Sequence, residues 1–199
     1  MVKEKQNLTH SRNHSKRMEQ VSCAFVLINI WIVDFAQRIK QLQDITQSKD
    51  YGRNNLWLGG LFYPEAYFTA TRQSAAQANE WSVENLELHV EVLESGKDAE
   101  TNESSFVVRD ILLEGAAWTQ KGLQLTNDIS MPLPPVRFEW KHRENEQTED
   151  KGNAISLPIY LNETRAEYLV AVDLEKPSDV HSNVWYQRGV ALSVWRVNV

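Results

Sequence analysis

The spacing of apolar residues divides the chain into a helical part and a longer part of short extended segments. Between Ser22 and Thr46 the apolar positions recur at intervals of four and three residues, with polar residues between them. They are Ile28, Ile32, Phe35, Ile39 and Leu42. This period predicts an amphipathic helix over 22–46.

A second helix is predicted to begin at Pro64 and to end near Asn79, because the fixed φ of proline suits the first turn of a helix. Small residues recur along it at fourfold spacing, at Ala66, Ala70, Ser74 and Ala78. Such a stripe lets another backbone approach closely. We therefore expect this face to pack inward, and Ala70→Trp to destabilise the domain by about 1–3 kcal/mol through overpacking.

Beyond the second helix, Ser82 is positioned to cap a short helical turn, and the apolar period then changes from helical to alternating. A strand-like run also precedes this helix at 56–62, and 184–188 is expected to form a helical turn. We expect a bulge at Gly115, a tight turn at Lys121-Gly122 and an edge or bulged position at Pro158. The predicted strands are 86–92, 106–109, 111–117, 123–126, 136–141, 155–161, 168–174 and 189–195.

Six to eight short strands that follow two helices predict an α+β fold with an antiparallel sheet, instead of repeated βαβ units. The sheet is expected to form an open or partly closed barrel, or a sandwich, packed against the helices. Six tryptophans, at positions 57, 81, 118, 140, 185 and 195, are expected to fill the core or its rim. An aromatic binding platform is the alternative role for them.

Composition bounds the class of protein. The 199 residues allow one domain with an appendage, and residues 1–20 are polar and basic, as in a disordered tail. A net charge of −6 disfavours a nucleic-acid partner, because binding phosphate needs a basic surface. The single cysteine, Cys23, excludes an internal disulfide framework and suits a reducing compartment.

Four N-x-S/T sequons and an apolar run at 21–33 leave a secreted glycoprotein as a minor alternative. The run is too short to span a bilayer, and Asp34 follows it directly. No small-residue cleavage site follows the run either. We therefore expect no membrane segment. The sequons are Asn7, Asn13, Asn102 and Asn162.

No motif for nucleotide binding or nucleophilic catalysis occurs in the sequence. It lacks G-x-x-x-x-G-K-[ST], G-x-G-x-x-G and G-x-S-x-G, and Gly59-Gly60 does not open a helix. The pair His10 and His14 has zinc-ligand spacing without further ligands, and His89 and His181 are isolated. We expect no catalytic residue, no metal and no cofactor.

The second helix also has candidate partner-interface residues. Arg72 is a long cation on a helix of small residues, which suits contact with a partner surface, although an ordinary solvated arginine is the alternative. Gln73 and Gln77 lie on the same helix. We take Arg72, Gln73 and Gln77 as the candidate interface.

The longest of several spaced motifs covers 58–82, with the pattern LGGLF-x-PEAY-x-TATRQ-x-x-AQAN-x-WS. It resembles the start of the C-terminal domain of the cytoplasmic dynein (type 1) heavy chain. Residues 31–47 resemble the helix upstream of that domain's barrel, whereas 1–30 resemble nothing in the family. Further matching motifs are LEGAAW (113–118), LP-x-YLN-x-TR (157–165) and W-Y-x-RGVAL (185–192). The resemblance therefore covers about 31–199.

The resemblance implies a helical segment over 31–82 and an incomplete antiparallel β-barrel over 83–199. It implies a non-catalytic regulatory domain that packs on the AAA+ ring modules of the heavy chain and modulates minus-end-directed motility. The ATP sites and the microtubule-binding stalk lie upstream in such heavy chains. The domain would thus act on the microtubule only indirectly, and its location would be cytoplasmic and cytoskeletal.

A stand-alone β-rich module that binds a peptide or a small ligand is the main alternative function. The sequence leaves open whether the chain is a natural short product or part of a complete heavy chain. It also leaves open the origin of residues 1–30.

Overall fold

A computed structural model describes residues 28–47, 53–93, 101–143 and 153–194. The chain divides into two compact units, residues 1–40 with 198–199 and residues 41–197. Several predicted features lie outside the described residues. They are the tail at 1–20, His10, His14, Cys23 and Trp195.

The described part of the first unit is helical, which confirms the predicted amphipathic helix from residue 28 onward. An ion pair links two residues one turn apart on this helix, with Nε of Arg38 2.6 Å from Oδ2 of Asp34. The rings of Trp31 and Phe35 stack with their centroids 5.4 Å apart. Both aromatic side chains are exposed.

The second unit begins with the end of this helix, which continues to residue 47. The Gln41 amide donates to the carbonyl of Trp57 and accepts from its N–H, both at 2.9 Å. These two bonds join the helix to β1 (Leu56–Trp57). The Gln41 side chain bonds the backbone N–H and carbonyl of Trp57, as a residue of a neighbouring strand would. Leu42 and Ile45 pack against the core.

The predicted strand at 56–62 is wrong beyond Trp57, since the chain turns into the 3-10 helix η1 (Leu58–Gly60). The two glycines explain the turn. A Cβ at Gly59 would lie 2.0 Å from the carbonyl oxygen of Val194, and one at Gly60 would lie 2.2 Å from the Trp57 ring. Only a backbone without side chains can pass this closely.

Helix α2 (Pro64–Asn79) begins at proline as predicted and ends at Glu80, whose φ of 57° is left-handed. Its buried residues are Pro64, Phe68, Ala75 and Ala76. The predicted inward face is therefore wrong. Ala66, Ala70 and Ala78 of the small-residue stripe are exposed, and Ser74 is half-buried.

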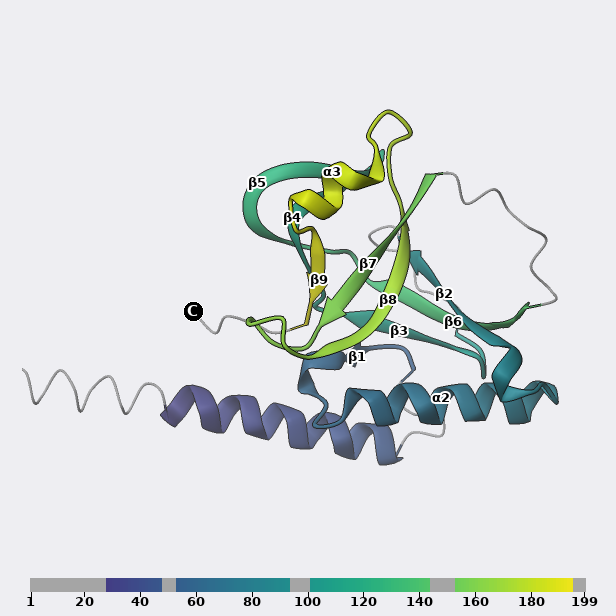
Figure 1. The fold of residues 1–199 in the computed structure, drawn as a ribbon. Helices are drawn as coiled ribbons and strands as arrows, with labels where there is room; N and C mark the ends of the chain where they lie inside the picture. Colours follow the sequence, from purple (N-terminus) through teal and green to yellow (C-terminus); the bar gives the residue numbers. More distant parts are fainter. Residues whose placement is uncertain (1–27, 48–52, 94–100, 144–152, 195–199) are drawn as a thin grey trace, which may run out of the picture. The chain divides into compact units, whose positions relative to one another are not determined.

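The orientation of α2 follows from Phe68, the large buried apolar side chain in its N-terminal half. The ring of Phe68 packs edge-on against Phe106 at 5.5 Å and against Phe138 at 5.7 Å. Those two rings stack on each other at 5.3 Å. Burying an aromatic ring stabilises far more than burying an alanine, so Phe68 and not the stripe faces the sheet. Helix α2 lies along one side of the strands (Figure 1).

Nine strands among the described residues form two sheets, ordered β1-β3-β6-β2 and β5-β4-β9-β7-β8. Most pairs are antiparallel, as predicted, but β1 with β3 and β7 with β9 run parallel. The α+β class is thereby confirmed. The remaining elements are η2 (Val83–Asn85), β2 (Leu86–Val92), β3 (Ser105–Arg109), β4 (Leu112–Thr119), β5 (Gly122–Pro132), β6 (Val136–His142), β7 (Ala154–Tyr160), β8 (Tyr168–Glu175), α3 (Ser182–Gln187) and β9 (Ala191–Ser193).

The predicted bulge at Gly115 is confirmed. Glu114 pairs with Ser130 and Ala116 with Leu125, so that residues 126–129 of β5 lie opposite this one glycine. Gly115 has φ +73°, which a side chain would strain. The bulge also lets β5 continue to Pro132, well beyond its predicted end.

Pro158 lies in β7, which has neighbours on both sides and is not an edge strand. Strand β9 pairs only with Ile159 and Tyr160, so the proline has no partner on that side. A register irregularity follows between Ile159 and Tyr160. The predicted bulged position is therefore close to the observed one, whereas the edge position is wrong.

The other local predictions concern turns and tryptophans. The turn at Lys121-Gly122 is confirmed, with Gly122 at φ +89°. Ser82 precedes η2 without a side-chain cap. Trp140 and Trp185 are buried in the core, and Trp81 and Trp118 pack against it. The core role predicted for the tryptophans is confirmed for these four.

Placing a tryptophan on each of the two faces of α2 tests which face packs against the rest of the unit. Ala75→Trp should lower the free energy of unfolding by about 1–3 kcal/mol, because Ala75 is fully buried and the added ring must displace its neighbours. Ala70→Trp, on the exposed stripe, should change it by no more than about 0.5 kcal/mol. Urea unfolding followed by circular dichroism measures both, and equal losses would show that the stripe is the packed face.

Candidate functional site

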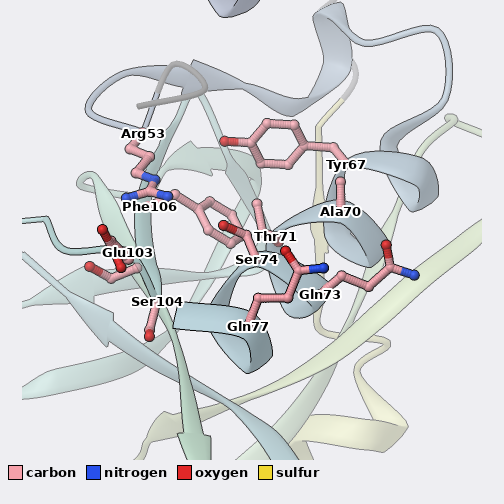
Figure 2. Close-up of a pocket in the computed structure, with 11 residues that line it drawn as sticks. Arg53, Tyr67, Ala70, Thr71, Gln73, Ser74, Gln77, Glu103, Ser104 and Phe106 are labelled. Carbon is pink, nitrogen blue, oxygen red and sulfur yellow. The ribbon is translucent and has the colours of Figure 1, made fainter. Parts of the chain in front are cut away.

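A hollow of about 270 Å³ lies between α2 and the corner of backbone that leads into β3 (Figure 2). Its polar wall is formed by Arg53, which lies three residues before β1, by the exposed side of α2, and by the residues around the start of β3. The lining residues are Arg53, Tyr67, Ala70, Thr71, Gln73, Ser74, Gln77, Glu103, Ser104, Ser105 and Phe106.

Arg53 is held at one end of the hollow by the backbone around β3. Its carbonyl accepts from the N–H of Val107 at 2.6 Å, and its Nη1 donates to the carbonyl of Asn102 at 3.0 Å. Its side chain points into the hollow beside Phe106 (Figure 2). Only 9% of the residue is exposed, which is unusual for an arginine.

Tyr67 forms the wall opposite Glu103. Its ring packs edge-on against Phe106 with 5.4 Å between centroids. Burial raises the pKa of the Tyr67 hydroxyl well above its ordinary value, and the positive charge of Arg53 lowers this pKa by a smaller amount. The hydroxyl is therefore protonated at neutral pH and keeps its ability to donate a hydrogen bond.

Two of the three predicted interface residues line this hollow. Gln73 and Gln77 are exposed and project from α2 (Figure 2). Arg72 lies elsewhere, with its guanidinium carbon 5.6 Å from the centre of the Trp140 ring and its Nη2 3.4 Å from the carbonyl of Leu86. It is half-buried between α2 and the sheet. The interface role of the three residues stays a prediction.

Neither Arg53 nor Tyr67 is among the site residues predicted from the sequence. Arg53 lies in a polar loop where nothing indicates burial, and Tyr67 lies in a helix whose orientation the sequence does not fix. Contacts between segments far apart in the sequence bring them together with Ser104 and Phe106. No local pattern holds that information.

A second hollow, of about 460 Å³, lies between the β4–β5 hairpin and the segment from β8 to α3. Leu123 and Trp185 are both fully buried and form its apolar part, while Lys121 and Asp179 are exposed. Among the described residues, the indole Nε1 of Trp185 has no hydrogen-bond acceptor. The hollow is suited to an apolar group.

Neither a metal-binding cluster nor a membrane-spanning helix is found among the described residues. No cluster there holds three or more His, Cys, Asp or Glu side chains close enough to bind a metal. No described helix is both long and apolar enough to cross a membrane. His181 has a structural role, because its Nδ1 accepts from the N–H of Asn183 and caps α3 at 3.3 Å.

Comparison with known proteins identifies the family. The family model for the C-terminal domain of the dynein heavy chain matches residues 25–194. This protein belongs to that dynein domain family. The match starts slightly before residue 31 and otherwise confirms the resemblance seen in the sequence.

Relatives of this dynein domain are heavy chains of much greater length. A cytoplasmic dynein heavy chain of Dictyostelium discoideum is 41% identical over 174 residues, and one of Drosophila melanogaster is 40% identical over 168. A ciliary dynein beta chain of Heliocidaris crassispina is 29% identical over 170 residues. These alignments cover 87%, 81% and 83% of this chain, but only 4% of each relative.

Three of the dynein-like motifs meet at one place in the second sheet. Nη2 of Arg165, from LP-x-YLN-x-TR, lies 2.5 Å from Oε2 of Glu114, from LEGAAW. Gly189, from the RGVAL motif, has φ +68°, and a Cβ added there would lie 3.4 Å from Nη1 of Arg165. The motifs of this dynein domain thus join β4, the β7–β8 loop and the entry to β9.

Tyr67 gives this dynein domain a testable pH dependence. Because its pKa is raised in the folded state, its contribution to stability is complete below the ordinary tyrosine pKa of about 10 and is lost as pH rises above it. Tyr67→Phe should therefore make the loss of stability between about pH 9 and 11 less steep. Urea unfolding at several pH values measures this.

The exposed Tyr63 supplies the control, and Tyr63→Phe should follow the unmodified protein. An equally steep loss with and without Tyr67 would mean that this hydroxyl ionises freely in the folded domain.

Proposed function

We propose that this protein is a non-catalytic C-terminal regulatory domain of a cytoplasmic dynein heavy chain. It packs on AAA+ ring modules of that heavy chain and modulates minus-end-directed movement along microtubules, which it affects only indirectly. The family membership and the identity to cytoplasmic heavy chains support this proposal. The same relatives support a cytoplasmic, cytoskeleton-associated location. We propose no nucleic-acid, membrane or cofactor partner.

The observation that supports the proposal most directly is the exposure of the apolar helix face in the first unit. Six large apolar side chains between residues 28 and 39 are each 37% to 64% exposed. An amphipathic helix normally buries this face, and a contiguous exposed apolar surface indicates a protein partner. They are Ile28, Trp31, Ile32, Val33, Phe35 and Ile39.

The occupant that we propose for this face is the preceding part of the same heavy chain. In the relatives this domain makes up only about 4% of the polypeptide, so most of the heavy chain lies outside it. A partner in the same polypeptide has a high effective concentration, so a modest apolar contact suffices to hold it.

The finer fold that we propose is an incomplete antiparallel barrel. The edge strands β5 and β8 of the second sheet approach each other where a Cβ at Gly122 would lie 3.2 Å from the carbonyl oxygen of Glu175. A partly closed sheet is stiff. A stiff body that contacts neighbouring modules can change the free-energy gap between two ring conformations.

We also propose that the domain has no ATPase activity of its own, because its sequence has no phosphate-binding loop. The purified protein with Mg²⁺ and ATP should release phosphate at the rate of a buffer blank. A rate that is above the blank and copurifies with the folded protein would contradict the proposal.

The effect on motility is tested in a complete heavy chain. Deleting the domain should change stall force or run length more than nucleotide affinity, and Ile32→Asp with Phe35→Asp should reproduce the change by placing charges on the apolar face. Gln37→Asp, at an exposed polar position of the same helix, is the matched control. Single-molecule motility with unchanged force and run length in the double variant would show that the face is not a ring contact.

A stand-alone module that binds a peptide or a small ligand is the second candidate function. The buried Trp185 in the 460 Å³ hollow favours it. Saturable quenching of tryptophan fluorescence by a ligand at micromolar concentration would support this alternative.

A further inference from the structure

We propose that the hollow between α2 and β3 is a binding site for a carboxylate, presented as an Asp or Glu side chain by a partner polypeptide, with Arg53 as the anion-binding group. The site is independent of the apolar helix face on which the proposed function rests. Its lining belongs entirely to residues 53–106 of the second unit.

The first reason is that Arg53 is buried without an ion pair to a described carboxylate, although the exposed Glu103 lines the same hollow. The guanidinium is positively charged at every physiological pH. Among the described residues, its single hydrogen-bond partner is the neutral carbonyl of Asn102, and no carboxylate lies within 4 Å. A buried charge is normally paired, because burial without an opposite charge is costly. A carboxylate in the hollow would supply the missing charge.

The second reason is the set of hydrogen-bond donors that line the rest of the hollow. The side-chain amides of Gln73 and Gln77 line the same space, and the protonated hydroxyl of Tyr67 adds no negative charge to it (Figure 2). The Thr71 hydroxyl donates to the Phe68 carbonyl, whereas the Ser104 hydroxyl accepts from Asn79 and keeps its own hydrogen to donate. Arg53 is therefore the group that would bind an anionic oxygen, and the two amides remain for other polar atoms of the same ligand.

The third reason concerns size and total charge. A volume of about 270 Å³ accommodates one side chain but not a nucleotide. Glu103 also lines the hollow and is exposed, so a group with a single negative charge is favoured over a phosphate dianion. The amides of Gln73 and Gln77 lie one helical turn apart on α2. They can therefore bond the backbone of the segment that presents the carboxylate.

The test uses the complete 199-residue protein and a capped amino acid. N-acetyl-glutamate N-methylamide is titrated while backbone amide NMR shifts are recorded. We expect saturable shifts at residues 53, 67, 73–77 and 103–106, with a Kd of about 1–10 mM at about 50 mM NaCl. The Kd should rise at least about threefold at about 500 mM NaCl, because salt screens the charge pair. The uncharged glutamine analogue should not saturate.

Two variants identify the residues responsible. Gln77→Glu places a negative charge at the hollow and should weaken the capped glutamate at least about fivefold. Gln187→Glu, an equally exposed position on α3 outside the hollow, should leave the Kd unchanged. Arg53→Gln should abolish the shifts. Because this variant removes a buried bond, its fold is checked by the shift pattern of the distant β7–β8 hairpin.

Three results would overturn the proposal. One is the absence of saturable shifts at the lining residues. Another is the same Kd in the Gln77→Glu variant as in the unmodified protein. The third is tighter binding of inorganic phosphate than of the capped glutamate, which would make the hollow a phosphate site. None of them depends on dynein motility, so failure here leaves the proposed ring contact untouched.

Discussion

The packing of three phenylalanines determines where α2 lies and what its outer face presents. Phe68 inserts edge-on against the stacked pair of Phe106 and Phe138, which come from β3 and β6. This contact turns Ala75 and Ala76 toward the sheet and leaves Ala70, Gln73 and Gln77 outside. The hollow beside Arg53 is a consequence, because it forms where the outer side of α2 meets the start of β3.

Glycines at points of close backbone approach determine how other elements of the second unit pack together. Gly59 and Gly60 let the backbone pass Val194 and the Trp57 ring, and Gly115 accommodates the long bulge of β5. Glycine is needed at these points because any Cβ would collide or be strained. The ion pair between Glu114 and Arg165 then connects two motifs that are far apart in the sequence.

The two proposed surfaces differ in chemistry and therefore suit different partners. The apolar helix face over 28–39 gains from exclusion of water, and it fits a permanent contact within one polypeptide. The hollow at Arg53 is polar and small, and it fits a single charged side chain.

The sequence by itself determined the family, both helices and the positions of most strands, because motifs and hydrophobic periods are local properties. It also located the bulge at Gly115 and the turn at Gly122. The tertiary structure decided which face of α2 packs inward, that β7 is an interior strand, and that Arg53 and Tyr67 share a hollow. These depend on contacts between residues distant in the sequence, where the burial of one large ring outweighs a regular pattern of small ones.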